Sequence, residues 1–244
     1  MKLLLVRHGD PDYEHDCLTE RGRAEAACLA ERMEKLCVKD FYVSPLGRAK
    51  ETASYTLNKT GREAETHEWL REFAPKIARP HDNGWMANVV WDWLPADWMA
   101  CPEFLDPEAW KENPIMRDGG VGEEYDRVIR NFDRLLADHG YVRDGRLYRA
   151  VEPNNDTLVF FCHFGVSCVL MSHLLSASPM VLWHGLAMAP TSVTTVVTEE
   201  RREGTAAFRA TAVGDISHLY AKHTEPSFSA RFCECYRNME ERHD

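Results

Sequence analysis

Short apolar runs recur along the chain where buried strands are expected. Residues 2–6, 41–43 and 158–162 are almost continuously apolar, which is typical of parallel strands buried on both faces. Residues 192–197 and 206–215 are two further β-rich runs, and a charged turn containing a glycine separates them. These five runs predict strands of one sheet.

Amphipathic segments of helical period lie between these runs. Residues 23–36 carry apolar side chains on one stripe of a predicted helix, with Thr19 as the expected N-cap. Residues 49–61 predict a second helix, which ends at Gly61. A third helix is predicted over residues 123–140, and another begins directly after the strand at 158–162. Because strand and helix alternate, the sequence predicts a three-layer α/β fold, a mostly parallel sheet flanked by helices.

The alternation breaks between residues 74 and 121. This stretch holds several prolines and five of the seven tryptophans, but it is shorter than a usual domain and has no repeating pattern. We interpret it as an insertion within a single domain covering residues 1–244. Its tryptophan-rich part, residues 85–99, fits an amphipathic helical cover on the core. A lid over a pocket is the alternative interpretation, because long insertions are often functional. The candidate lid residues are Trp85, Trp91 and Trp93.

Charge and composition exclude several classes of function. The 29 Lys and Arg against 39 Asp and Glu give a net charge of −10, which argues against general binding to nucleic acid or to an anionic membrane. No apolar run has the length of a membrane-spanning helix, and residues 2–6 are too few for a signal peptide, so we expect a soluble, cytoplasmic protein. The eight scattered cysteines lack zinc-site spacing and are expected to be reduced thiols.

Charged and imidazole side chains follow directly where the buried strands end. The first strand leads into Arg7-His8-Gly9, and the strand at 158–162 leads into His163. In open α/β sheets functional groups gather at the carboxyl ends of the strands, so the two imidazoles meet if these strands are neighbours. Two other extended segments, at 41–43 and near 65–70, end close to an arginine and a glutamate. The candidate set is Arg7, His8, Arg48, Glu72 and His163.

This set resembles the histidine phosphatase superfamily, which has a phosphoglycerate mutase-like fold. The resemblance covers nearly the whole chain, with its motifs in the family's order: RHG at 7–9, LTERG at 18–22, SPLGRAKETA at 44–53, Glu72, Gly122-Glu123, HFG at 163–165 and GDISHL at 214–219. It implies that His8 is a nucleophile that forms a phosphohistidine. It also implies that Glu72 is the general acid, because Phe164 stands where another branch has an Asp. Glu68 and an Asp of the insertion remain alternatives for the acid.

The chemistry of these residue types suits phosphoryl transfer. Guanidinium groups bind phosphate oxygens bidentately and stay charged, so Arg7 and Arg48 are the expected phosphate ligands, and His163 would add a third positive charge if protonated. With this charge supplied by side chains, we expect no metal and no cofactor. His8 must be neutral to attack, so we expect the two histidines to differ in protonation, with the other ring nitrogen of His8 donating to a backbone carbonyl.

Departures from the family pattern bear on the pocket rim and on the choice of reaction. Pro11 stands where a hydroxyl is common, and Phe164 replaces a frequent glycine, so both are assigned to the pocket rim. The segment EFAPK at 72–76 lacks the mutase-like run beginning at the acid, which favours hydrolysis of a phosphomonoester. Mutase-type phosphoryl transfer and a non-catalytic module that binds a phospho-ligand are the alternatives. The expected partner is a small-molecule phosphomonoester, and a homodimer through a sheet edge or the insertion is a candidate assembly.

Overall fold

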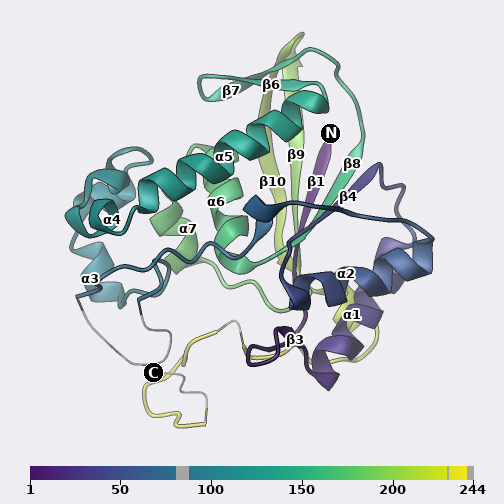
Figure 1. Ribbon diagram of the computed structural model, residues 1–244, viewed down its shortest axis with the longest axis horizontal. Coiled ribbons are helices and arrows are strands. Elements are labelled where there is room, and N and C mark those ends of the chain that lie inside the picture. Colours follow the sequence, from purple (N-terminus) through teal and green to yellow (C-terminus); the bar gives the residue numbers. More distant parts are fainter. Residues whose placement is uncertain (81–87, 230, 241–244) are drawn as a thin grey trace.

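An eight-stranded sheet forms the centre of the computed structural model, which describes residues 1–80, 88–229 and 231–240 (Figure 1). The strands follow the order β5-β4-β8-β1-β9-β10-β7-β6. Their bounds are β1 Lys2–Arg7, β4 Asp40–Val43, β5 Glu65–Thr66, β6 Tyr141–Asp144, β7 Leu147–Ala150, β8 Thr157–Cys162, β9 Val193–Arg202 and β10 Thr205–Asp215. The short strands β2 (Pro11–Asp12) and β3 (Cys17–Leu18) pair separately with each other.

The parallel part of the sheet consists of β5, β4, β8 and β1. The next strands pair antiparallel, beginning with β9, which lies beside β1. The predicted α/β fold with a helix-flanked sheet is confirmed, and all the strand ends that carry the candidate residues belong to the parallel part.

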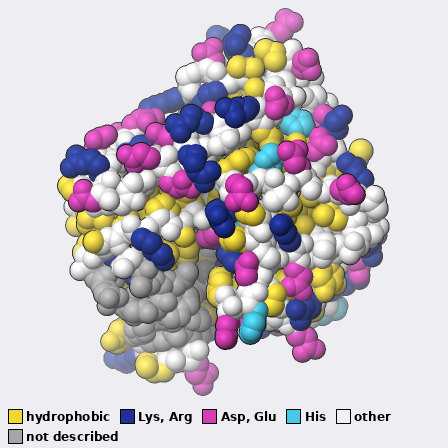
Figure 2. All heavy atoms as spheres, in the orientation of Figure 1, with side chains coloured by type: hydrophobic (Ala, Val, Ile, Leu, Met, Phe, Trp, Pro, Cys, Tyr) yellow, Lys and Arg dark blue, Asp and Glu magenta, His cyan; other side chains and the backbone are white. Residues whose placement is uncertain are grey.

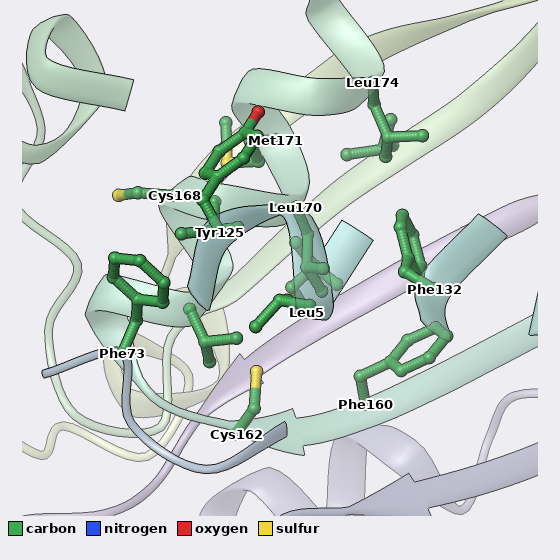
Figure 3. Packing of buried hydrophobic residues seen from close by; sticks show 14 of the residues in the cluster. Leu5, Phe73, Tyr125, Phe132, Phe160, Cys162, Cys168, Leu170, Met171 and Leu174 are labelled. Atoms are coloured by element: carbon green, nitrogen blue, oxygen red, sulfur yellow. The ribbon is translucent and has the colours of Figure 1, made fainter. Parts of the chain in front are cut away.

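The sheet separates two apolar layers. In β1, Leu3 and Leu5 face one layer, and Leu4 and Val6 face the other, as the two-residue period of a strand requires. β8 alternates in the same way, and its Phe160 packs edge-on against Phe132 in the layer shown in Figure 3. Burial on both faces explains why these strands are continuously apolar.

Helices cover both faces of the sheet (Figure 1). The longer helices are α1 Glu20–Met33, α2 Gly47–Thr60, α5 Val121–Asp138 and α6 Phe164–Leu175, and the shorter ones are α7 Pro179–Gly185 and α8 Ser217–Tyr220. The hydroxyl of Thr19 accepts from the backbone N–H of Gly22, so the predicted N-cap of α1 is confirmed. Gly61 ends α2 with a φ of 65°, a left-handed conformation that glycine adopts without strain.

A hairpin formed by β6 and β7 was not expected from the apolar pattern. Its two-residue turn is Gly145-Arg146, with Gly145 at a φ of 60°. A glycine at the first position of a two-residue turn is typical of hairpins, so this element could have been predicted from its turn rather than from its strands.

The insertion packs into the same apolar cluster as β1 and β8. Its described part contains α3 Pro95–Met99, α4 Pro114–Asp118 and the 3-10 turns Pro102–Leu105 and Ala109–Glu112. The amphipathic helical cover predicted over 85–99 is helical only at Pro95–Met99 within residues 88–99, because Pro95 occupies the first turn of a helix that begins there. Residues 81–87, including Trp85, lie outside the described residues. Trp93 and Trp110 are buried in the core cluster.

The surface in Figure 2 carries interspersed acidic and basic side chains. Within the described ranges, none of the helices combines the length and apolarity needed to cross a bilayer. All eight cysteines are free thiols, as expected.

His184 of α7 holds the insertion against the core. Its Nε2 accepts from the backbone N–H of Trp93 at 3.2 Å, its Nδ1 donates to the carbonyl of Met180 at 2.7 Å, and the Trp98 ring stacks on it at 5.2 Å. Burial lowers the pKa of His184 from 6.5 to about 4. The contact with Trp93 requires the neutral form of the ring, because a protonated Nε2 cannot accept from the Trp93 N–H.

We expect acid to weaken the attachment of the insertion through this group. Since the pKa of His184 is lower in the folded protein than in the unfolded chain, its stabilising effect is complete above pH 6.5 and is lost as the pH falls to about 4. The free energy of unfolding of the wild type, relative to His184→Gln, should fall by up to about 3 kcal/mol over that interval. Urea denaturation at several pH values measures this difference, and a constant difference would contradict the prediction.

Candidate active site

The candidate residues meet at the carboxyl ends of β1, β4 and β8. β1 and β8 are adjacent parallel strands, and the backbone N–H of His8 donates to the carbonyl of Cys162 at 3.0 Å. The rings of His8 and His163 therefore lie with their centres 5.1 Å apart. Both imidazoles are buried, with 2% of His8 and none of His163 exposed.

The contacts of His8 define which of its nitrogens can attack. Nδ1 lies 2.7 Å from the carbonyl oxygen of Gly9 and donates to it, so the lone pair is on Nε2. Nε of Arg48 donates to this Nε2 at 3.3 Å. The His8 ring is thus oriented by the backbone, and the nitrogen that carries its lone pair faces a guanidinium group.

Arg48 is positioned by Asp16, which the sequence analysis did not identify. Asp16 accepts from Nη1 of Arg48 at 2.5 Å and from the backbone N–H of Gly47 at 2.6 Å. Burial opposes its ionisation, but these hydrogen bonds outweigh that effect and lower the pKa of Asp16. Asp16 has a φ of 48°, and that backbone conformation is not readable from the sequence. Gly47 is needed because a Cβ there would collide with the carbonyl oxygen of Asp16.

Arg7 is buried at the end of β1, with 6% of its surface exposed. Its Nη1 donates to the carbonyl of Met188 at 2.6 Å, and its Nη2 to the carbonyl of Ser229 at 3.5 Å. Its Nε is buried and has no hydrogen-bond partner among the described residues. A buried donor without an acceptor is costly, so this position favours an anion.

His163, like Arg7, has a buried nitrogen without a hydrogen-bond partner among the described residues. Its Nε2 lies 2.7 Å from the hydroxyl of Ser44, and that hydroxyl also accepts from the backbone N–H of Leu46 at 3.3 Å. Because Ser44 accepts from Leu46, its own proton can be donated to Nε2, which leaves the His163 proton on Nδ1. In the described part of the chain, Nδ1 is buried and unpaired.

Both histidines are neutral in the free site. Burial lowers the pKa of His8 well below 6.5, and the charges of Arg7 and Arg48 lower it further. Burial also lowers the pKa of His163 well below 6.5, with added repulsion from His8 and the two arginines. The expectation that the two histidines differ in protonation is therefore not met in the free site, because the same burial and the same arginines act on both.

Glu72 lies at the amino end of α6. Its Oε1 accepts from the backbone N–H of Phe73 at 2.7 Å and from that of Val166, in the first turn of α6, at 3.1 Å. Burial raises the pKa of Glu72, whereas the Phe73 N–H and the charge of Arg48 oppose the rise. A carboxyl group with a raised pKa, within the field of Arg48 and Arg7, can hold a proton for donation.

The two residues assigned to the pocket rim, Pro11 and Phe164, lie in different elements. Pro11 belongs to β2 and pairs with Leu18, while Phe164 is the first residue of α6 and packs edge-on against Trp91 at 5.9 Å. Trp91 is partly buried, whereas Trp93 packs into the core against Phe104. The role of the insertion as a lid stays a prediction.

A carboxylate cluster joins the first loop to the C-terminal segment, which the sequence analysis left without chemistry. Asp10 accepts from the hydroxyls of Ser227, Ser229 and Thr19. Glu25 is fully buried and accepts from the backbone N–H groups of Asp10 and Ser227 at 3.0 and 3.1 Å. Burial raises the pKa of Glu25 to about 7. No sequence signal connects residues this far apart in the chain.

No group of three or more His, Cys, Asp or Glu side chains among the described residues is arranged to hold a metal ion.

The fold and this arginine–histidine set define a protein of the phosphoglycerate mutase-like class. The sequence model of the histidine phosphatase superfamily (branch 1) matches residues 3–211, and the chain belongs to this superfamily. The family predicted from the sequence motifs is thereby confirmed.

A curated relative and several solved structures are similar to this chain. A 2,3-bisphosphoglycerate-dependent phosphoglycerate mutase of Thermoplasma acidophilum is 29% identical over 86 residues, which are 31% of this chain and 43% of that protein. A phosphoserine phosphatase from Entamoeba histolytica has a TM-score of 0.58 at 21% identity, over 89% of this chain and 98% of the other. The alpha-ribazole phosphatase from Shigella flexneri has a TM-score of 0.52 at 16% identity, over 88% and 97%. At these identities the solved structures support the fold.

Replacement of Gly47 by alanine is expected to weaken phosphate binding. The added methyl group collides with the carbonyl of Asp16 and displaces the loop that holds Arg48. Loss of one charge-assisted hydrogen bond should reduce the affinity for inorganic phosphate roughly tenfold. Gly185→Ala is the control, because a Cβ there meets nothing within 4 Å. Titration calorimetry measures both affinities, and equal binding by the two variants would be inconsistent with this role of Gly47.

Proposed function

We propose that the protein hydrolyses phosphomonoesters without a metal, through a phosphohistidine on His8. One observation carries the proposal: Nδ1 of His8 donates to the Gly9 carbonyl, so the lone pair is on Nε2, where it accepts a hydrogen bond from Nε of Arg48. A nucleophile placed against a guanidinium group is suited to an electrophile that carries negative oxygens.

The free donors of the site would bind the phosphoryl group. Nε of Arg7 and Nδ1 of His163 are buried without partners in the described part of the chain, and phosphate oxygens would accept from both. Arg48 adds a charge that persists through the reaction. Because the transition state spreads its charge over the phosphoryl oxygens, these preorganised donors would stabilise it.

The reaction then proceeds in two steps. Nε2 of His8 attacks phosphorus, the bond from phosphorus to the ester oxygen breaks, and the protonated Glu72 donates its proton to that oxygen. In the second step the Glu72 carboxylate takes a proton from water, the water oxygen attacks phosphorus, and the bond from Nε2 to phosphorus breaks. The products are an alcohol and inorganic phosphate, and both side chains return to their initial states.

The proposed substrate is a small-molecule phosphomonoester. Several fold neighbours carry the names of phosphatases, including phosphoserine phosphatase, glucosyl-3-phosphoglycerate phosphatase and alpha-ribazole phosphatase. The mutase from Thermoplasma acidophilum favours phosphoglycerate mutase activity as a second candidate. A mutase, unlike the proposed hydrolase, would transfer its phosphoryl group to an acceptor hydroxyl faster than to water.

Hydrolysis of p-nitrophenyl phosphate tests the proposal. We expect turnover in the presence of EDTA, and a loss of more than roughly a thousandfold in His8→Ala, because this change removes the nitrogen that would form the covalent intermediate. Mass spectrometry of a rapidly quenched reaction should detect a phosphoryl group on His8. Turnover by His8→Ala, or turnover that EDTA abolishes, would refute the mechanism.

A further inference from the structure

Trp91 contacts the segment that carries Glu72. Its indole N–H donates to the carbonyl oxygen of Phe73 at 2.8 Å, and Phe73 directly follows Glu72. Trp91 belongs to the insertion, whereas Glu72 follows the short 3-10 turn Glu68–Leu70. The hydrogen bond therefore ties the proposed general acid to a different part of the chain.

Phe73 itself is anchored in the core. It is 2% exposed, and its ring stacks on Trp183 at 5.5 Å. In Figure 3 the ring of Phe73 lies in the cluster near Tyr125 and Cys168. Its side chain is thus fixed on one side, and its carbonyl is fixed by Trp91 on the other, so the backbone after Glu72 has little freedom to rotate.

Trp91 and Glu72 also press against the same residue of α6. A Cβ added at Gly165 would lie 2.7 Å from Oε1 of Glu72 and 2.8 Å from Nε1 of Trp91. Only a glycine leaves room for both groups, and Trp91 is further fixed by its edge-on contact with Phe164. The indole and the carboxyl group therefore both lie against Gly165 at the start of α6.

We propose that Trp91 is a positioning residue for Glu72, a role that rests on the proposed function. General acid catalysis requires the proton donor within hydrogen-bonding distance of the leaving oxygen, and the unbranched Glu side chain can rotate about three bonds. Trp91 limits this freedom by holding the carbonyl of Phe73, the residue whose backbone N–H donates to Glu72 at 2.7 Å. Trp91 does not touch the reacting atoms.

The dependence of the rate on the leaving group separates this role from a purely structural one. Protonation of the ester oxygen matters most when that oxygen is a strong base, as in phenyl phosphate, and least when it is a weak base, as in dinitrophenyl phosphate. A displaced acid therefore slows the first substrate selectively. Loss of folded enzyme lowers the rate equally for both, so the ratio of the two kcat/KM values is independent of the folded fraction.

We would measure kcat/KM for both esters with the wild type, Trp91→Phe, Glu72→Gln and His8→Ala. Trp91→Phe removes the indole N–H and should lower kcat/KM for phenyl phosphate roughly tenfold, and for dinitrophenyl phosphate by less than about twofold. Glu72→Gln should change the same ratio further in the same direction, by roughly a hundredfold.

Trp110→Phe is the matched control. Its indole lies in the same insertion, and its Nε1 has no hydrogen-bond partner among the described residues, so this change should leave the ratio at the wild-type value. A wild-type ratio in Trp91→Phe, with an altered ratio in Glu72→Gln, overturns the positioning role and leaves the proposed function intact. Turnover by His8→Ala instead overturns the proposed function itself.

Discussion

Two buried guanidinium groups determine much of what this structure can do. Arg7 and Arg48 lie at the carboxyl end of the sheet, where a charge without partners would be costly. Two backbone carbonyls hold Arg7, whereas Arg48 is paired with Asp16. Burial lowers the pKa of His8 and of His163, and the positive potential of the two arginines lowers both further. The same charges that would attract a phosphoryl group therefore also favour the neutral form of His8.

Backbone groups, rather than other side chains, supply most of the precision at this site. The Gly9 carbonyl selects the tautomer of His8, and the N–H groups of Phe73 and Val166 hold Glu72. Such contacts depend on where the strands end and where α6 begins. The long apolar strands thus matter to the chemistry. β1 and β8 end shortly before Gly9 and Val166, so the packing of these strands sets where those two backbone groups lie.

The sequence predicted the parts of the molecule that depend on local pattern. The spacing of apolar residues and the residue types at helix ends are visible in the sequence. They located the apolar strands, the Thr19 cap and the glycine after α2. Asp16 could not, because its role depends on a left-handed backbone conformation and on contact with a helix that starts later. Ser227 and Ser229 reach Asp10 across more than two hundred residues, which no local pattern records.

The position of β1 in the sheet has a consequence for protein synthesis. Lys2 pairs with Thr157 on one side and with Val197 on the other, so both neighbours of β1 are translated long after β1 itself. Until β8 and β9 leave the ribosome, the apolar run of β1 has no native partner and is exposed to incorrect association. The centre of the sheet therefore forms late in translation, after β8 and β9 have been made.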